Sequence, residues 1–305
     1  IHLKIIKMKL RNKNKIFIVL PIYNDWISLN RLLKDLNKHA KKNSLLFNIL
    51  IINDCSSKIG KINLKNLDKI KKLEILNLKK NCGNQVAIAI GLRFLVKKKN
   101  VSKIIVMDSD GEDDPYKINT LITKLKNNKK KFVFASRAKR KENIILKFLN
   151  NIRLVFSFIL TWKYINYGNF SCFNYSELKR IVDKKDLFLA YCSSATNFSD
   201  IIKVPIKKNS RYQGLSKANF KFLFIHSLNI ISVFKKRILL ISIFYLFLIF
   251  LIYFFNYNYY YDEKKVLNII TFLLIFSNIV IFCINYFKKD VLYFEKFIKN
   301  ILKIK

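Results

Sequence analysis

Two long apolar segments near the C-terminus constrain this chain more than any other feature of its sequence. Residues 238–255 and 266–286 are almost wholly apolar, and each approaches the roughly 20 residues that a helix needs to cross a bilayer. Lysine and arginine precede the first segment and follow the second, so the positive-inside rule places both flanks in the cytoplasm. We therefore expect a transmembrane hairpin over residues 235–290, with the connecting loop 256–265 outside. The alternative is a pair of buried helices in a soluble core.

The composition agrees with a protein that associates with a membrane. The chain combines a formal net charge of +39 with 51% hydrophobic residues, which is rare in a soluble globular protein. So basic a chain suits an anionic membrane surface or nucleic acid, and the apolar segments favour the membrane over specific nucleic-acid binding. Residues 1–15 lack the apolar stretch of a signal peptide, so we expect the first domain to be cytoplasmic. The five cysteines are scattered, without the spacing of a zinc site or a disulfide framework.

Short β-rich segments alternate with helical stretches in the first part of the chain, which predicts a parallel α/β sheet. We expect strands at residues 16–20, 47–53, 73–77, 104–107 and 132–136, and helices at 28–42, 85–98 and 115–127. Some of the strand segments are apolar throughout, as a sheet covered on both faces requires. In such sheets the ligand binds in the crevice at the carboxyl ends of the strands.

Two further segments, 144–162 and 220–234, are apolar but interrupted. They predict amphipathic helices that lie on the membrane surface or pack in a core. The expected organisation is a cytoplasmic catalytic domain over 1–234 that ends in the second of these helices, the transmembrane hairpin over 235–290, and a cytoplasmic basic tail over 291–305.

Acidic residues are scarce in this chain, yet they gather directly after the strand expected at 104–107. The run Asp108-Ser109-Asp110-Gly111-Glu112-Asp113-Asp114 crowds like charges that need a compensating cation. A hard divalent ion, Mg²⁺ or Mn²⁺, would bridge such carboxylates to the diphosphate of a nucleotide sugar. The alternative is a solvated acidic turn. Asp114 is better explained as the N-cap of a helix that begins at Pro115.

Several segments together resemble family 2 of the inverting glycosyltransferases, which has the GT-A (Rossmann-like) fold. They are Pro21-Ile22-Tyr23-Asn24 after the first strand, Asn53-Asp54-Cys55-Ser56 after the second, Asn81-Cys82-Gly83-Asn84, and Asp108-Ser109-Asp110, which matches the metal-binding DxD motif. The resemblance implies nucleotide-sugar binding by Pro21, Tyr23, Asn24, Asp54, Asn81, Gly83 and Asp108. It also implies a metal held by Asp108, Asp110 and Glu112, the last in a position that the family often fills with Gln.

Within this family the chain is most similar to the polyprenyl-phosphate branch, which includes dolichol-phosphate mannosyltransferases and bactoprenol glucosyltransferases. Arg211-Tyr212-Gln213-Gly214-Leu215-Ser216-Lys217 resembles that branch's Arg-x-x-Gly-x-Ser-Lys signature, and Asn169 stands where the branch is expected to carry Asp. The resemblance implies acceptor-phosphate binding by Arg211, Ser216 and Lys217, and catalytic roles for Asp110, Arg211 and Lys217. Arg137, a basic residue after the fifth expected strand, is a further candidate for acceptor-phosphate binding. We expect these basic residues to form a cationic clamp for the acceptor phosphate. The clamp should lie at the height of the lipid headgroups, distant from the DxD motif.

The function predicted from the sequence is inverting transfer of a sugar from a UDP- or GDP-linked donor to a polyprenyl phosphate. A phosphomonoester is already largely ionised at neutral pH, so this acceptor needs a cationic clamp and no general base. One alternative keeps the fold but uses a glycan or lipid-linked oligosaccharide as acceptor, with a base such as Asp113. A second is a non-catalytic basic membrane scaffold or nucleic-acid binder. Whether the protein forms a homo-oligomer is left open.

Overall fold

The computed structural model describes residues 15–58, 60–128, 131–137, 144–214, 220–255, 261–287 and 294–305. The chain divides into two compact units. The first unit comprises residues 1–141, 166–217 and 291–305, and the second comprises residues 142–165 and 218–290.

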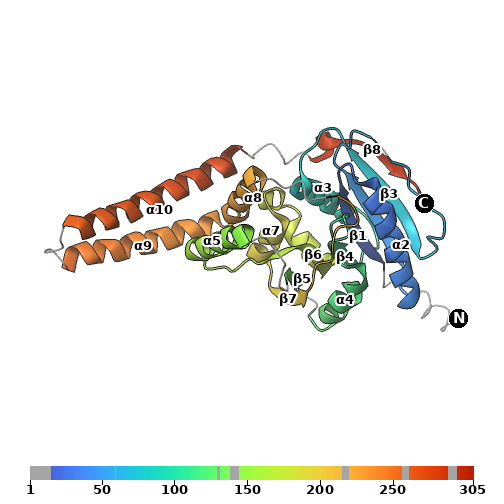
Figure 1. Cartoon of the computed structure of the whole chain (residues 1–305), viewed down its shortest axis with the longest axis horizontal. Coiled ribbons are helices and arrows are strands. Elements are labelled where there is room, and N and C mark those ends of the chain that lie inside the picture. Colours follow the sequence, from blue (N-terminus) through green and yellow to red (C-terminus); the bar gives the residue numbers. More distant parts are fainter. Residues whose placement is uncertain are drawn as a thin grey trace. The chain divides into compact units, whose positions relative to one another are not determined.

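The first unit is built on an eight-stranded sheet with the order β7-β5-β6-β4-β1-β2-β3-β8 (Figure 1). Its strands are β1 (Ile16–Ile22), β2 (Phe47–Asn53), β3 (Ile70–Leu78), β4 (Lys103–Val106), β5 (Phe132–Arg137), β6 (Tyr167–Asn174), β7 (Ile201–Ile206) and β8 (Ile298–Lys303). Strands β1 to β4 run parallel to one another, whereas β6 is antiparallel to its neighbours β4 and β5. The carboxyl ends of β1, β2, β3 and β4 therefore meet at one edge, which is where a ligand crevice is expected.

Helices cover both faces of this sheet. Helix α2 (Trp26–Lys42) and helix α4 (Ile118–Lys126), which follows the 3₁₀ turn η1 (Pro115–Lys117), share one core cluster with alternate residues of the strands. Helix α3 (Asn84–Val96) packs on the other face, where Gly91 approaches the sheet so closely that an added Cβ would lie 2.7 Å from Ile52 Cδ1. Helix α6 (Tyr175–Ile181), turn η2 (Lys185–Phe188) and helix α7 (Tyr191–Phe198) complete the described helices of the central region.

The second unit is helical. It contains α5 (Ile144–Thr161), α8 (Phe220–Ser232), α9 (Lys235–Phe255) and α10 (Tyr261–Phe287). Helices α9 and α10 lie side by side as an antiparallel pair (Figure 1). Hydrogen bonds link them, among them those from Asn278 Nδ2 to Ser242 Oγ at 2.8 Å and from Tyr253 Oη to Asn268 Oδ1 at 2.9 Å. Helix α9 and residues 264–287 of α10 are long and apolar enough to cross a membrane.

The predicted fold class is confirmed: an α/β sheet precedes a C-terminal pair of apolar helices, and every predicted strand is present. The sequence patterns did not reveal β6, β7 or β8. Residues 291–305 were expected to be a tail, but residues 298–303 form β8 and pair with β3. Strand β3 would otherwise present an unpaired edge, which the backbone of β8 covers by antiparallel pairing. Helices α5 and α8 group with α9 and α10, so the compact units do not divide at residue 234.

Candidate active site

The acidic loop, residues 108–113, follows β4 at the carboxyl edge of the sheet. Two hydrogen bonds shape it: Asp108 N donates to Asp113 Oδ2 at 2.9 Å, and Ser109 Oγ donates to the carbonyl of Pro21 at 2.8 Å. The second bond ties the loop to the end of β1. Gly111 has a φ of 88°, a left-handed conformation that glycine adopts without the strain a Cβ would cause. Asp114 caps η1 as predicted, since its Oδ1 accepts from Tyr116 N at 2.9 Å.

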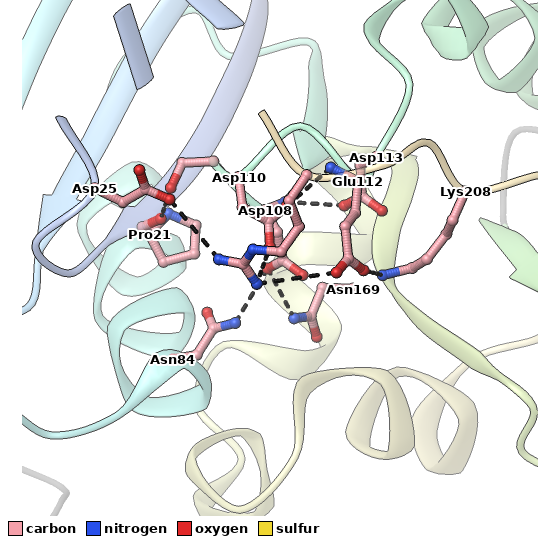
Figure 2. A network of polar contacts seen from close by, with 11 residues as sticks. Pro21, Asp25, Asn84, Asp108, Asp110, Glu112, Asp113, Asn169 and Lys208 are labelled. Atoms are coloured by element: carbon pink, nitrogen blue, oxygen red, sulfur yellow. Dashed lines mark hydrogen bonds and ion pairs between the residues drawn. The ribbon is translucent and has the colours of Figure 1, made fainter. Parts of the chain in front are cut away.

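Two amides hold the first acid of the motif. Asn84 Nδ2 and Asn169 Nδ2 donate to Asp108 Oδ1 at 3.1 and 3.2 Å (Figure 2). Asn169 is itself fixed, because Gln85 Nε2 donates to its Oδ1 at 3.1 Å. The buried Oδ1 of Asn84 has no hydrogen-bond partner within the described part of the chain. A buried unpaired oxygen beside a carboxylate is an acceptor that a ligand or a cation can satisfy.

Arg211 lies among the acids. Its Nη1 is 3.0 Å from Asp110 Oδ2 and 3.9 Å from Glu112 Oε1, and its Nη2 is 3.8 Å from Asp25 Oδ2. The Lys208 ammonium pairs with Glu112 Oε2 at 2.6 Å. Figure 2 shows Asp25, Lys208 and the acidic side chains converging from separate segments. The expected separation between the arginine and the DxD motif is therefore wrong.

The reason for this proximity is the path of the basic loop, residues 207–212, which follows β7. Asn209 N donates to the carbonyl of Glu112 and Tyr212 N to the carbonyl of Asp110, both at 2.9 Å. The Tyr212 ring lies so close to Gly111 that an added Cβ there would come within 2.5 Å of it. Backbone pairing and this close contact thus hold the basic loop against the acidic loop.

Charge crowding raises the pKa values of two acids. Burial, followed by the negative charge of Asp108, raises the pKa of Asp110 to about 6 and that of Asp113 to about 7. Burial alone would lower the pKa of Lys208, but the charges of Asp113 and Asp108, together with the ion pair to Glu112, outweigh it and raise that pKa overall. The acidic loop is therefore an environment that favours cations.

Apart from Asp108, the residues predicted to bind the nucleotide sugar lie at the end of β1 or in the loops after β1, β2 and β3. Asp54 is buried, and its carboxylate accepts hydrogen bonds from Cys82 N and Gly83 N, both at 2.8 Å. Asn24 accepts from Ser57 N at 2.9 Å.

Two further residues of the predicted nucleotide-sugar set are placed by the structure. Tyr23 is 44% exposed, and Asn81 Oδ1 accepts from Gly83 N at 3.1 Å. In this structure Asp54 fixes the loop before α3, and its binding role stays a prediction.

Several predicted acceptor residues cannot be placed. Ser216 and Lys217 lie outside the described residues, and Arg137 is described only through its backbone at the end of β5. A small open pocket lies beside the acidic loop, and its lining residues include Glu112, Asp113, Ser136, Gly168 and Lys208.

Sequence reasoning missed Lys208 and the amide of Asn84 as parts of the site. Lys208 is one of 58 lysines and arginines, so its type carried no signal. Its position after a β-rich segment could have indicated that it belongs to the site, but β7 was not predicted. Asn84 belongs to a motif that was noticed, and only the fold brings it to Asp108.

Comparison with known proteins identifies the family of the chain and supports its fold. A family model described as glycosyl transferase family 2 matches residues 17–201, and no curated protein matches the chain. Glucosyl-3-phosphoglycerate synthase from Mycobacterium tuberculosis, in complex with Mn²⁺, UDP-glucose and phosphoglyceric acid, is 12% identical. It aligns over 75% of this chain and 82% of its own with a TM-score of 0.50. This likeness supports the GT-A fold.

Two other solved structures are also similar. Mannosyltransferase PcManGT from Pyrobaculum calidifontis, in complex with GDP-Man and Mn²⁺, is 12% identical over 91% of this chain and 88% of its own, with a TM-score of 0.42. S. aureus TarS 1-349 is 13% identical over 72% of this chain, with a TM-score of 0.45. The match spans 65% of TarS 1-349 and 39% of the longer TarS chain.

Proposed function

Because this chain belongs to glycosyl transferase family 2, we propose that it transfers a sugar from a UDP- or GDP-linked donor to a polyprenyl phosphate. In this reaction an oxygen of the lipid phosphate attacks the anomeric carbon from the face opposite the leaving group. The bond between that carbon and the nucleoside diphosphate breaks, so the configuration inverts and the diphosphate leaves with the electron pair. The observation that carries the proposal is the contact of Arg211 with Asp110 at 3.0 Å.

This contact supports phosphate chemistry because it joins the two kinds of group that such a reaction needs. Carboxylates of a DxD motif suit a cation bound to a diphosphate, and a guanidinium binds phosphate oxygens through two parallel hydrogen bonds. Arg211 and the ammonium of Lys208 would bind and orient phosphate groups of the substrates. Asn84 and Asn169 would hold the Asp108 carboxylate in one orientation.

A divalent cation, Mg²⁺ or Mn²⁺, is the proposed cofactor. Among the described residues no three acidic, histidine or cysteine side chains are arranged to hold a metal, because Asp110 and Glu112 point to Arg211 and Lys208. The donor chemistry nevertheless fits: Asp108, Asp110 and Glu112 offer hard oxygen ligands, and the buried Asn84 Oδ1 has no hydrogen-bond partner among the residues that the structure describes. When bound, the cation would neutralise the diphosphate leaving group. Arg211 would have to release Asp110 for this to occur.

Membrane anchoring supports a lipid acceptor. Helices α9 and α10 would carry the enzyme to the bilayer that holds the polyprenyl phosphate. Exposed apolar side chains on α5, such as Val155 at 60% and Phe156 at 52%, suit insertion at the interface beside them. The glycan-acceptor alternative needs a base, and its candidate, Asp113, is 5% exposed and already accepts from Asp108 N.

The topology of this proposal has its own support. Strand β8 follows α10 in the chain and pairs with β3, whereas β1 to β7 precede α9. The chain must therefore leave and return on the same side, which agrees with two crossings and a cytoplasmic sheet. A reporter fused after Lys305 should be cytoplasmic, and single cysteines in loop 256–265 should be labelled from outside. Labelling of the chain end at Lys305 from outside would contradict the hairpin.

The proposed function is tested by acceptor specificity. Purified full-length protein in detergent is incubated with UDP-glucose or GDP-mannose, Mn²⁺, and either undecaprenyl phosphate or undecaprenol. We expect transfer to the phosphate and none to the alcohol, which lacks the group that Arg211 is proposed to bind. Transfer to neither lipid but to an oligosaccharide acceptor would favour the alternative.

A further inference from the structure

Three asparagines form a row across the carboxyl edge of the sheet. Asn53 of β2 lies opposite Asn77 of β3, which lies opposite Asn300 of β8. Asn53 Nδ2 donates to Asn77 Oδ1, and Asn77 Nδ2 donates to Asn300 Oδ1, each at 2.7 Å. Asn53 and Asn77 are only 2% and 5% exposed, so the bond between them is shielded from water, whereas the bond to Asn300 is partly buried. Leaving a buried amide unpaired is costly, so each member of the row fixes its neighbour.

The row continues into the loops that follow β1 and β2. Asn53 Oδ1 accepts from Ser56 N at 3.0 Å, and Ser56 Oγ accepts from Asn24 N at 2.9 Å. Asn24 Oδ1 in turn accepts from Ser57 N at 2.9 Å. The described contacts thus run without interruption from the C-terminal strand to the loop 54–57 and to Asn24, where the nucleotide of the donor is proposed to bind.

Strand β8 has other anchors that do not involve this row. Lys79 N donates to the carbonyl of Phe297 at 2.8 Å, and Leu73 N donates to that of Lys305 at 3.0 Å. The Lys80 ammonium lies 5.4 Å from the centre of the Phe297 ring. Asn300 itself is exposed on the edge strand. A change at Asn300 should therefore leave β8 in place and alter mainly the row.

We propose that Asn300 is a positioning residue for the nucleotide-sugar donor, acting through Asn77 and Asn53 on the loop 54–57. This inference rests on the proposed function, because it requires that the loop contacts the nucleotide. Strand β8 is reached only after the chain has passed through α9 and α10. The donor site is then complete only when the segment beyond the membrane pair has folded back onto the sheet, which links membrane insertion to donor binding.

The test compares three variants of the full chain in detergent, with UDP-glucose and GDP-mannose as donor probes. Asn300→Ala removes the acceptor of the Asn77 amide, and we expect the KM for the donor to rise about two- to ten-fold with little change in kcat. Asn300→Asp keeps an acceptor oxygen at the same place and should restore the wild-type KM. Lys299→Ala, an exposed neighbour outside the row, is the matched control and should change neither value.

Thermal unfolding of each variant shows whether it is folded under the conditions in which the KM is measured. The inference is overturned if Asn300→Ala leaves the donor KM unchanged, or if Asn300→Asp fails to restore it. It is also overturned if Lys299→Ala raises the KM equally, since the strand would then act as a whole. Should the alanine variant not fold, Asn300→Ser, which lacks the amide oxygen that accepts from Asn77, takes its place. If the wild type binds neither donor, the proposed function fails instead.

Discussion

The acidic loop and the α9–α10 pair differ in the chemistry and the exposure of their side chains. In the acidic loop, charged side chains from distant segments meet: Asp110 faces Arg211 and Glu112 faces Lys208. In the helix pair, the side chains are apolar and point outward, with Leu240 68% and Phe282 70% exposed. A water-facing protein would not tolerate so continuous an apolar surface. The contrast separates a region of paired charges from a region of exposed apolar side chains, which is the arrangement that the proposed charged, lipid-borne substrate would require.

The largest expected effect is at Asp110. Asp110→Asn removes the charge that faces Arg211 and that is proposed to bind the cation, so kcat should fall by about 10³-fold. The measurement is the initial rate of sugar transfer to undecaprenyl phosphate at saturating donor and Mn²⁺. Asp114→Ala is the matched control within the acidic run, and it should cost about 1 kcal/mol of stability by loss of the N-cap while transfer persists. Near-normal turnover of Asp110→Asn would show that the charge of Asp110 is not needed for transfer.

Arg211 should have the next largest effect. Arg211→Ala removes charge-assisted hydrogen bonds, so kcat/KM should fall by about ten- to a hundred-fold. Because Arg211 contacts Asp110, we expect the loss in the donor dependence as well as in the acceptor dependence. Arg211→Lys should recover only part of the rate, since an ammonium cannot form two parallel bonds. Arg180→Ala, on α6, serves as a control, and an unchanged acceptor dependence in Arg211→Ala would assign the arginine to the donor alone.

Asp113 separates the two acceptor classes. Asp113→Asn keeps an oxygen that accepts from Asp108 N, so the loop should survive. With a phosphate acceptor, which needs no base, transfer should fall by no more than about ten-fold. If a carboxylate base were required, the loss would be about 10²- to 10⁴-fold. A loss of that size with a correctly folded protein would favour a hydroxyl acceptor.

The smallest expected effect lies in the helix pair. Asn278→Leu removes the interhelical bond to Ser242 and should destabilise the pair by about 0.6 kcal/mol, because such bonds contribute modestly in membranes. Thermal unfolding in detergent would report the shift, while the KM for the donor should not move. Leu273→Ala on the exposed surface of α10 is the control. A large change in donor KM for Asn278→Leu would show that the two regions are not energetically separate.

The same contrast explains what could be predicted from the sequence. The apolar helices follow from local composition alone, and the buried strands from short apolar segments, so α9, α10 and β1 to β5 were identifiable. The DxD acids were identifiable because acids are scarce elsewhere. Strand β8 was missed because its residues show no apolar and polar alternation and its partner, β3, lies far away in the sequence. The contact of Arg211 with Asp110 depends on the backbone pairing of two loops that no local pattern reveals.

The most direct test of the central claim is the identity of the lipid product. Full-length protein is incubated with undecaprenyl phosphate and each nucleotide sugar, with Mn²⁺ or with a chelator, and the organic phase is analysed by mass spectrometry. The account predicts a glycosylated undecaprenyl phosphate that forms with one donor, requires the metal, and is absent with Asp110→Asn. A product that forms equally in the chelator, or a sugar found only on a hydroxyl acceptor, would contradict it.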